Sequence, residues 1–252
     1  MKLITPDQFK EFSTLKDDPH YFIAESERVV EKLFLSDLKL VRALVSKEFY
    51  AKYKETIEQK LNASDIHIAS KSELEQITGF KLHHGVMIKG QKPDSIELDQ
   101  LGDKILIFDR LAGAENIGSI IRSSAAFGFS SYICSPQCID PYIRRAVRVS
   151  MGNIFHSKVH YAQNLIETIH ELKERGYSVL AAENRDWAVP IDEVEQPKKL
   201  AIIIGSEAYG IAQEIFAHCD ATIKIPISDE VYALNASIAA SILCFHFALK
   251  RN

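Results

Sequence analysis

Three polar segments of the sequence follow short apolar runs and carry side chains suited to ligand binding or catalysis. In the first, residues 109–127, the side chains of Asn116, Ser119 and Arg122 lie near the start of an expected helix. A guanidinium there can hold a phosphate or a carboxylate through paired, charge-assisted hydrogen bonds. A solvated helix face with an N-terminal cap explains the same residues, so this segment alone leaves both interpretations open.

The second and third segments, residues 202–211 and 223–240, each contain a candidate ligand-binding turn. Gly205 follows the apolar run of the second segment, where a residue without a side chain lets the backbone approach a ligand closely. An ordinary turn with a polar residue near a helix cap is the alternative. Asn235 precedes an apolar helix in the third segment, so it is either a site residue or only the helix N-cap.

Several common site motifs are missing from these segments. The stretch GSEAYG lacks the serine placement of the G-x-S-x-G hydrolase turn. No G-x-G-x-x-G or G-x-x-x-x-G-K-[ST] pattern is present, which disfavours a nicotinamide oxidoreductase and a P-loop protein. Cys134 and Cys138 have a spacing that a metal site could use, but no matching Cys or His pair follows. We therefore expect no metal.

The elements expected to position these segments alternate along the second part of the chain. Continuous apolar strands separated by helices predict a parallel sheet covered on both faces. Ligands of such sheets bind beyond the carboxyl ends of the strands, where all three segments begin. The expected strands span 105–108, 131–134, 177–182, 200–204 and 221–225, and the expected helices span 118–127, 143–149, 165–175 and 234–250.

The first part of the chain predicts a smaller α/β unit. Its expected strands are 21–24, 40–45, 66–68 and 85–88. Two expected helices begin at Thr5 and at Glu27, and a third spans 71–77. The polar stretch 90–104, with two glycines and a proline, has the composition of a linker. We therefore expect two domains, residues 1–97 and 98–252.

Composition limits the class of protein. The chain has 252 residues, 46% hydrophobic and 25% charged, which is typical of a globular protein of one or two domains. Its net charge of −4 argues against indiscriminate binding to polyanions but allows a local basic patch. No apolar run is long enough for a transmembrane helix, no signal peptide is recognisable, and four scattered cysteines fit a reducing compartment. These features predict a cytoplasmic protein.

Taken together, the three segments resemble the signature motifs of the SpoU (TrmH-like) family of RNA ribose 2′-O-methyltransferases, within the SPOUT superfamily. The carrying patterns are N-x-G-x-x-x-R at 116–122, G-S-E-x-x-G at 205–210 and I-P…L-N-x-S-x-A at 225–239. The resemblance covers residues 103–252. The N-terminal part, through FIAESERVV and LHHGVMI, is similar to the ribosomal-protein-like RNA-binding domain that many members carry.

The resemblance implies a parallel-sheet SPOUT domain that ends in a deep trefoil knot and binds S-adenosylmethionine. It also implies a homodimer with the active site near the subunit interface. Arg122 would be the residue most tied to catalysis, supported by Asn116, Glu207 and Asn235. The implied cofactor contacts, largely through backbone, are Ile204, Gly205, Ile225, Leu234 and Ala236.

The implied reaction is attack of a ribose 2′-oxygen on the sulfonium methyl group. Arg122 would act either as the proton acceptor or electrostatically, and a guanidinium pKa above 12 makes the electrostatic role easier to defend. One departure from the family bears on activity, because Ala233 replaces a serine. A lost hydrogen bond of about 0.5–1.5 kcal/mol slows a reaction roughly tenfold without abolishing it. Ser237 lies nearby in the sequence.

Contact with RNA requires local positive charge or stacking surfaces. Arg144, Arg145 and Arg148 share one helical turn and could form a phosphate-binding face. Tyr209 could stack on a base, and Trp187 is either a stacking residue or a core or dimer contact. His83 and His84 we expect to be structural.

The sequence therefore predicts an RNA 2′-O-methyltransferase acting on ribosomal or transfer RNA, with ribosomal RNA slightly favoured. The expected partners are RNA and a second copy of the chain, with no membrane and no DNA. The alternative is a non-catalytic RNA-binding or ribosome-assembly protein on the same fold, which Ala233 keeps open.

Overall fold

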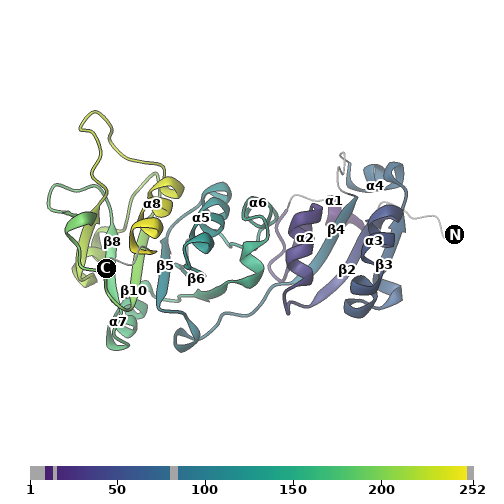
Figure 1. Ribbon diagram of the computed structural model, residues 1–252, viewed down its shortest axis with the longest axis horizontal. Helices are drawn as coiled ribbons and strands as arrows, with labels where there is room; N and C mark the ends of the chain where they lie inside the picture. Colours follow the sequence, from purple (N-terminus) through teal and green to yellow (C-terminus); the bar gives the residue numbers. More distant parts are fainter. Residues whose placement is uncertain (1–8, 14–15, 80–84, 249–252) are drawn as a thin grey trace. The chain divides into compact units, whose positions relative to one another are not determined.

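The computed structural model describes residues 9–13, 16–79 and 85–248 (Figure 1). The chain forms two compact units, residues 1–93 with 142–155 and residues 94–141 with 156–252. The first boundary between the two units, after residue 93, lies inside the stretch 90–104 that was expected to be a linker. The segment 142–155, however, packs with the first unit although it lies in the expected second domain. The expected cap Thr5 and the pair His83 and His84 lie outside the described residues.

The first unit contains a mixed four-stranded sheet in the order β1-β4-β2-β3. The pairs β1–β4 and β4–β2 are antiparallel, whereas β2–β3 is parallel. Its strands are β1 (Tyr21–Glu25), β2 (Leu40–Ser46), β3 (Ile66–Ala69) and β4 (Val86–Gln91). Its helices are α1 (Lys10–Ser13), α2 (Glu27–Phe34), α3 (Lys47–Lys60), α4 (Lys71–Thr78) and α6 (Arg144–Val149).

Local sequence explains two helices of this unit. Helix α2 buries the four apolar residues whose spacing predicted it: Val29, Val30, Leu33 and Phe34. Helix α4 begins with a reciprocal cap between Ser70 and Glu73 and ends at Gly79, whose φ of 76° is the left-handed conformation that glycine adopts readily. Helix α3 was not predicted, because it is mostly polar and buries only Phe49 and Ile57.

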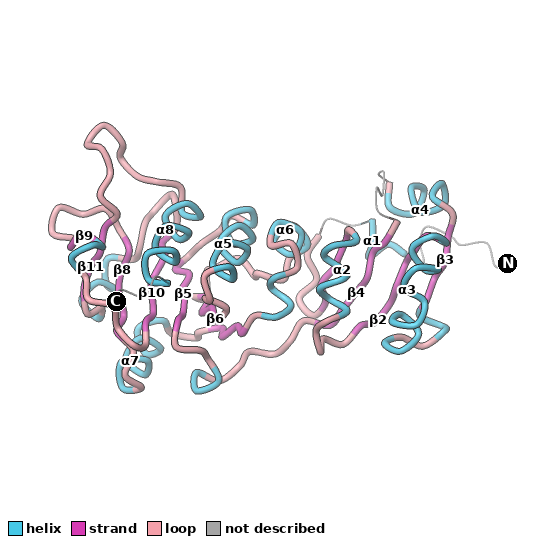
Figure 2. Tube along the Cα trace, in the orientation of Figure 1, coloured by secondary structure: helices cyan, strands magenta, loops and turns pink. Residues whose placement is uncertain are grey.

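The second unit is built on a seven-stranded sheet in the order β7-β6-β5-β10-β8-β11-β9, of which Figure 2 labels all strands but β7. Every neighbouring pair is parallel. The predicted parallel sheet is therefore confirmed. The short edge strands β7 and β9 were not predicted. The strands are β5 (Lys104–Asp109), β6 (Ser131–Cys134), β7 (Lys158–Tyr161), β8 (Ser178–Ala182), β9 (Val189–Pro190), β10 (Leu200–Gly205) and β11 (Ala221–Lys224).

Helices cover both faces of this sheet, as expected. Ala201 and Ile203 of β10 belong to the same buried cluster as Ile169 and Leu172 of α7 (Leu165–Glu174). Because strand side chains alternate, the other β10 residues face the opposite layer. There α5 (Ala114–Ala126) and α8 (Ala236–Ala248) pack side by side (Figure 1).

Helix α5 begins earlier than the sequence analysis expected. Gly113 occupies its N-cap position, so the helix starts at Ala114 rather than at about Gly118. Asn116 therefore lies inside the first turn, and Gly118 is buried within the helix. Short 3₁₀ turns are η2 (Ala63–Asp65), η3 (Leu98–Gln100), η4 (Asn153–His156), η5 (Ile191–Glu193) and η6 (Gln213–His218).

Two further expectations concern the whole chain. Among the described residues, no helix combines the length and the apolar character needed to cross a membrane. All four cysteines are free thiols. The threading of the C-terminal end into a trefoil knot stays a prediction.

Candidate active site

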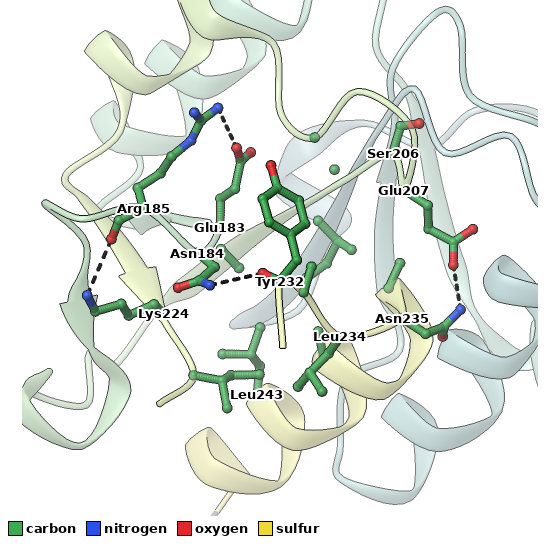
Figure 3. Close-up of a pocket in the computed structure, with 18 of the residues that line it drawn as sticks. Glu183, Asn184, Arg185, Ser206, Glu207, Lys224, Tyr232, Leu234, Asn235 and Leu243 are labelled. Carbon is green, nitrogen blue, oxygen red and sulfur yellow. Dashed lines mark hydrogen bonds and ion pairs between the residues drawn. The ribbon is translucent and has the colours of Figure 1, made fainter. Parts of the chain in front are cut away.

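A cavity of about 530 Å³ opens at the carboxyl ends of β8, β10 and β11 and at the start of α8 (Figure 3). This is the location that the rule for open parallel sheets predicts. Its walls combine aliphatic side chains with a few polar ones, as small-molecule sites do. The five residues implied to contact a cofactor all line it: Ile204, Gly205, Ile225, Leu234 and Ala236.

Gly205 is required by the protein's own turn. After β10 the chain reverses, and the Gly210 N–H donates to the Ser206 carbonyl over 2.7 Å. A Cβ atom on Gly205 would lie 2.4 Å from the carbonyl carbon of Gly210 and 2.5 Å from the Ile211 nitrogen. The turn alone therefore explains a glycine at this position, and the approach of a ligand to its backbone stays a prediction.

The structure brings together one polar side chain from each of the three motifs. The Asn235 Nδ2 donates to the Asn116 Oδ1 over 3.1 Å and to the Glu207 Oε1. Asn235 also caps α8, since its Oδ1 accepts from the Ser237 N–H over 2.9 Å. The N-cap interpretation of Asn235 is thus confirmed, and its capping bond fixes the amide that orients Asn116 and Glu207. Its role as a site residue stays a prediction.

The serine close to the substituted position is already engaged. The Ser237 hydroxyl donates to the Asn235 Oδ1 over 2.6 Å, so its proton supports the polar cluster. Ala233 lines the cavity and offers no hydroxyl there. Ser237 therefore strengthens the hold on Asn235 rather than replacing a hydroxyl at position 233.

Arg122 is exposed on α5 and does not line the cavity. It follows Asn116 by six residues, which turns its side chain by about 240° around the helix axis. Ser123 lies on the Asn116 side instead and accepts a hydrogen bond of 2.7 Å from the Ser241 hydroxyl of α8. Within one chain, the structure does not bring Arg122 together with the other three predicted catalytic residues.

The sequence analysis missed the polar residues that follow β8. Glu183, Asn184 and Arg185 line the cavity, and Figure 3 shows the Glu183–Arg185 pair across the view from Glu207 and Asn235. The Glu183 Oε1 lies 2.5 Å from the Arg185 Nη2. These residues come directly after an apolar run that was correctly predicted as a strand. Their position after this strand is the signal by which they were identifiable.

Exposed aromatic residues lie at and near the cavity. Tyr209 and Tyr232 line it, and both side chains are largely exposed. Trp187 is 61% exposed, and the Arg185 guanidinium lies 5.5 Å from its ring centroid. A core role for Trp187 is therefore excluded, whereas base stacking and a dimer contact stay predictions.

The three arginines predicted to contact RNA lie on α6 in the first unit. Arg144 and Arg148 both reach Glu25, at 2.6 and 3.2 Å, which confirms that their spacing places them on one face. The Arg144 side chain is only 12% exposed and also donates to the Phe12 carbonyl. Arg145 and Arg148 are exposed. Phosphate binding stays a prediction, and the guanidinium of Arg144 already has protein partners.

A metal centre finds no support in the described part of the chain. There, no group of three or more His, Cys, Asp or Glu side chains could hold a metal ion. Cys134 is buried, and the pKa of its thiol is raised by the interaction with Cys138 and by burial.

Known proteins resemble the chain in sequence and in fold. A relative from Staphylococcus haemolyticus, assigned by name to the TrmH family of tRNA/rRNA methyltransferases, is 37% identical over 148 residues. That match spans 59% of this chain and 59% of the relative. A TrmH-family protein of Porphyromonas gingivalis has a similar structure, with a TM-score of 0.84, 20% identity and coverage of 97% and 98% of the two chains.

The SpoU methyltransferase AviRb of Streptomyces viridochromogenes, solved with AdoMet, has a TM-score of 0.81 at 19% identity and covers 96% of this chain and 97% of its own. At such identities the likeness establishes the fold. Residues 103–245, more than half of the sequence, match the SpoU rRNA Methylase family. The motif cluster and the parallel sheet lie within this stretch, and the chain belongs to that family.

Proposed function

We propose that this chain is an S-adenosylmethionine-dependent methyltransferase that modifies a ribose 2′-hydroxyl of RNA. The observation that carries the proposal is the Asn116–Asn235–Glu207 cluster on the wall of the cavity. Family membership supports the reaction class. The AdoMet bound to AviRb, which shares this fold, supports the cofactor.

The cavity suits a nucleoside-containing cofactor. Aliphatic residues such as Leu234 and Leu243 offer an apolar surface for a base, and Asn184 offers a polar group. Its volume of about 530 Å³ lies within the usual range for small-molecule sites. S-adenosylmethionine would supply an electrophilic methyl group there. The protein would hold it mainly through Ile204, Gly205, Ile225, Leu234 and Ala236.

The remaining residues would orient and activate the ribose. Asn235, held by Ser237, fixes the Glu207 carboxylate beside the cavity, so a hydroxyl entering there would meet a preorganised acceptor. The 2′-oxygen must lose its proton as it attacks. Arg122 would hold the adjacent phosphate and stabilise the developing negative charge. Water or phosphate would take the proton.

A homodimer would explain the position of Arg122. Helix α8 is apolar on nearly every side, yet Ile238 and Phe245, two turns apart on one face, stay exposed. Phe245 also contacts Phe127 at the end of α5, with ring centroids 5.7 Å apart. A second copy packed on this face would cover the apolar side chains. It would also place Arg122 of one protomer beside the cavity of the other.

For the RNA, ribosomal RNA is favoured and transfer RNA is the alternative, in a cytoplasmic setting. The first unit would bind the substrate, with the exposed Arg145 and Arg148 meeting phosphates. In the second unit, Tyr209 at the cavity would stack on a base. The knot and the homodimer belong to the same proposal.

The test is methyl transfer from labelled S-adenosylmethionine to unmodified total RNA, followed by size fractionation. Alkali-resistant label at one dinucleotide of one RNA class is expected, because 2′-O-methylation blocks cleavage at that position. Label at a base would contradict ribose methylation.

The second candidate is a non-catalytic RNA-binding protein on the same fold, favoured by Ala233. It predicts RNA binding that is indifferent to the cofactor and no label in any RNA. Calorimetry with S-adenosylmethionine separates the two, since only the enzyme requires cofactor binding. If binding is absent, Ala233→Ser is the first substitution to make.

A further inference from the structure

Two carboxylates from the strands on either side of β10 hold consecutive backbone N–H groups. The Asp109 Oδ2, at the end of β5, accepts from the Ala212 N–H over 2.8 Å. The Glu183 Oε2, just after β8, accepts from the Ile211 N–H over 2.7 Å. These four residues form what we call the carboxylate clamp. It grips the chain directly after the turn that begins at Gly205.

Each carboxylate of the clamp has an arginine close by in the sequence. The Arg110 Nε lies 3.5 Å from the Asp109 Oδ2, and its Nη2 donates to the Gly210 carbonyl over 3.4 Å. The Arg185 Nη2 lies 2.5 Å from the Glu183 Oε1. Each half of the clamp therefore joins a carboxylate both to a backbone N–H and to a neighbouring guanidinium.

The two halves of the clamp differ in what surrounds them. Asp109 is 3% exposed and is not part of the cavity wall. The Glu183 side chain is 18% exposed and lines the cavity (Figure 3). The Glu183 carboxylate also packs closely against the turn, because a Cβ atom on Gly210 would lie 2.7 Å from its Oε2. One carboxylate thus faces the core, and the other lies where a ligand would bind.

We infer that Glu183 is a positioning residue of the cavity. By holding Ile211 it fixes the end of the 206–210 turn, and with it the direction of Glu207 and the bare backbone of Gly205. Its effect on a ligand passes through the turn and depends on its hydrogen-bond acceptor. Asp109 holds the next N–H for the stability of the fold. For the ligand S-adenosylmethionine, the inference rests on the proposed function.

The experiment compares Glu183→Ala with Glu183→Gln, which keeps an acceptor of the same reach. Calorimetry should show S-adenosylmethionine binding weakened about 10- to 100-fold by the alanine, the range expected for losing a hydrogen bond to a charged group. The glutamine variant should bind within about threefold of the wild type. Equal weakening by both variants would mean direct charge contact with the ligand and would overturn the inference. Wild-type affinity in Glu183→Ala would also overturn it.

Hydrogen exchange in the ligand-free protein keeps the inference separate from the proposed function. Glu183→Ala should speed amide exchange in a peptide covering 205–212, and Glu183→Gln should not. Unchanged exchange in Glu183→Ala overturns the clamp even if the wild type binds no S-adenosylmethionine. Absent wild-type binding with accelerated exchange instead overturns the proposed function alone.

Asp109→Asn is the matched control on the other half of the clamp. It keeps an acceptor for Ala212 and removes the charge beside Arg110. We expect a lower melting temperature and S-adenosylmethionine affinity within about twofold of the wild type. An affinity loss as large as that of Glu183→Ala would show that any weakening of the fold reaches the cavity, which would contradict a specific role for Glu183.

Discussion

The two units of this chain use their polar side chains differently. In the first, ion pairs join different elements of the unit, as in Arg144–Glu25, Arg42–Glu11 and Lys52–Glu27. In the second, strand-end carboxylates and amides also hold backbone turns, as Glu183 does while paired with Arg185 and as Asn235 does at the start of α8.

The difference follows from strand direction. A parallel sheet gathers all its strand-to-helix turns at one edge, and these turns leave backbone groups that need partners. The polar side chains that satisfy them therefore collect where ligands bind. A mixed sheet distributes its turns over both edges, and its charges are available for stability and for surface contacts. Topology thus assigns the candidate site to the second unit.

The substitution with the largest expected effect tests whether the turn after β10 determines the stability and the cofactor binding of the second unit. Gly205→Ala places a Cβ atom within 2.4 Å of the turn backbone, so the turn must move. We expect destabilisation of about 3 kcal/mol or more, as for other severe packing or backbone conflicts. Loss of S-adenosylmethionine binding should accompany it. Chemical denaturation and calorimetry measure the two effects.

Gly128→Ala is the control for this substitution. Gly128 has a φ of 81°, but a Cβ atom there meets no neighbour within 4 Å. The cost should be about 1 kcal/mol, from backbone conformation alone, with unchanged cofactor affinity. Equal costs for the two substitutions would show that collision with the turn is not the reason for the glycine at 205.

Arg122→Ala should have the next largest effect, and on the reaction alone. Arg122 is exposed and lies outside the cavity lining, so its removal should leave S-adenosylmethionine affinity and melting temperature unchanged. Methyl transfer should fall about 10²- to 10³-fold, the usual loss for one electrostatic contact to a transition state. Single-turnover rates with saturating cofactor measure this. Full activity would contradict the proposed role of Arg122.

How far the sequence predicts this molecule depends on whether local pattern or tertiary contact decides a feature. The apolar spacing of α2 and the buried strand β10 were correctly predicted, because burial leaves a periodic or continuous apolar signal. Strand β9 has only two residues and is too short to show a periodic or continuous apolar pattern.

The features of the site also fall into those that local sequence reveals and those that tertiary contacts decide. Asn235 was identifiable, because capping residues have a local signature. The reason for Gly205 was not, because it depends on where Gly210 and Ile211 return. Likewise, the acceptors of the Ile211 and Ala212 N–H groups come from strands about 30 and 100 residues away in sequence. No single-sequence pattern specifies such partners.

In the first unit, Arg144→Ala should cost stability rather than only RNA affinity. The substitution leaves Glu25, whose side chain is 12% exposed, without its closest cation. We expect a loss of about 2 kcal/mol, below that of a fully buried pair. Arg148→Ala removes a largely exposed partner of the same carboxylate and should cost less than about 1 kcal/mol. Denaturant titration compares the two variants.

RNA binding then separates the roles of these arginines. Arg148→Ala should weaken RNA binding and reduce its salt dependence, because one phosphate contact is lost. If it alters neither, the α6 arginines serve the structure of the first unit alone. If Arg144→Ala leaves stability unchanged, ion pairs between elements do not stabilise the first unit as the comparison requires.

The smallest effect is a difference in pH response between the two units. Burial and the nearby Arg42 lower the pKa of His67 in the first unit, against weaker opposing effects of Asp65 and Glu11. The unfolded chain then takes up a proton more readily than the folded one. The stability that neutral His67 allows is therefore present above its ordinary pKa of 6.5 and lost as the pH falls below it.

In the second unit, two thiols with raised pKa values titrate only at alkaline pH. Burial raises the pKa of Cys219 to about 11 and that of Cys244 to about 12. Both thiols stay almost fully protonated in the folded and the unfolded chain between pH 7.5 and 5.5, so they contribute nothing to acid sensitivity. Corrected for the intrinsic rate, amide exchange should therefore rise between pH 7.5 and 5.5 in peptides of β3 and its neighbours but not in β10. His67→Gln should remove the rise, and a rise of equal size in both units would contradict the assignment to His67.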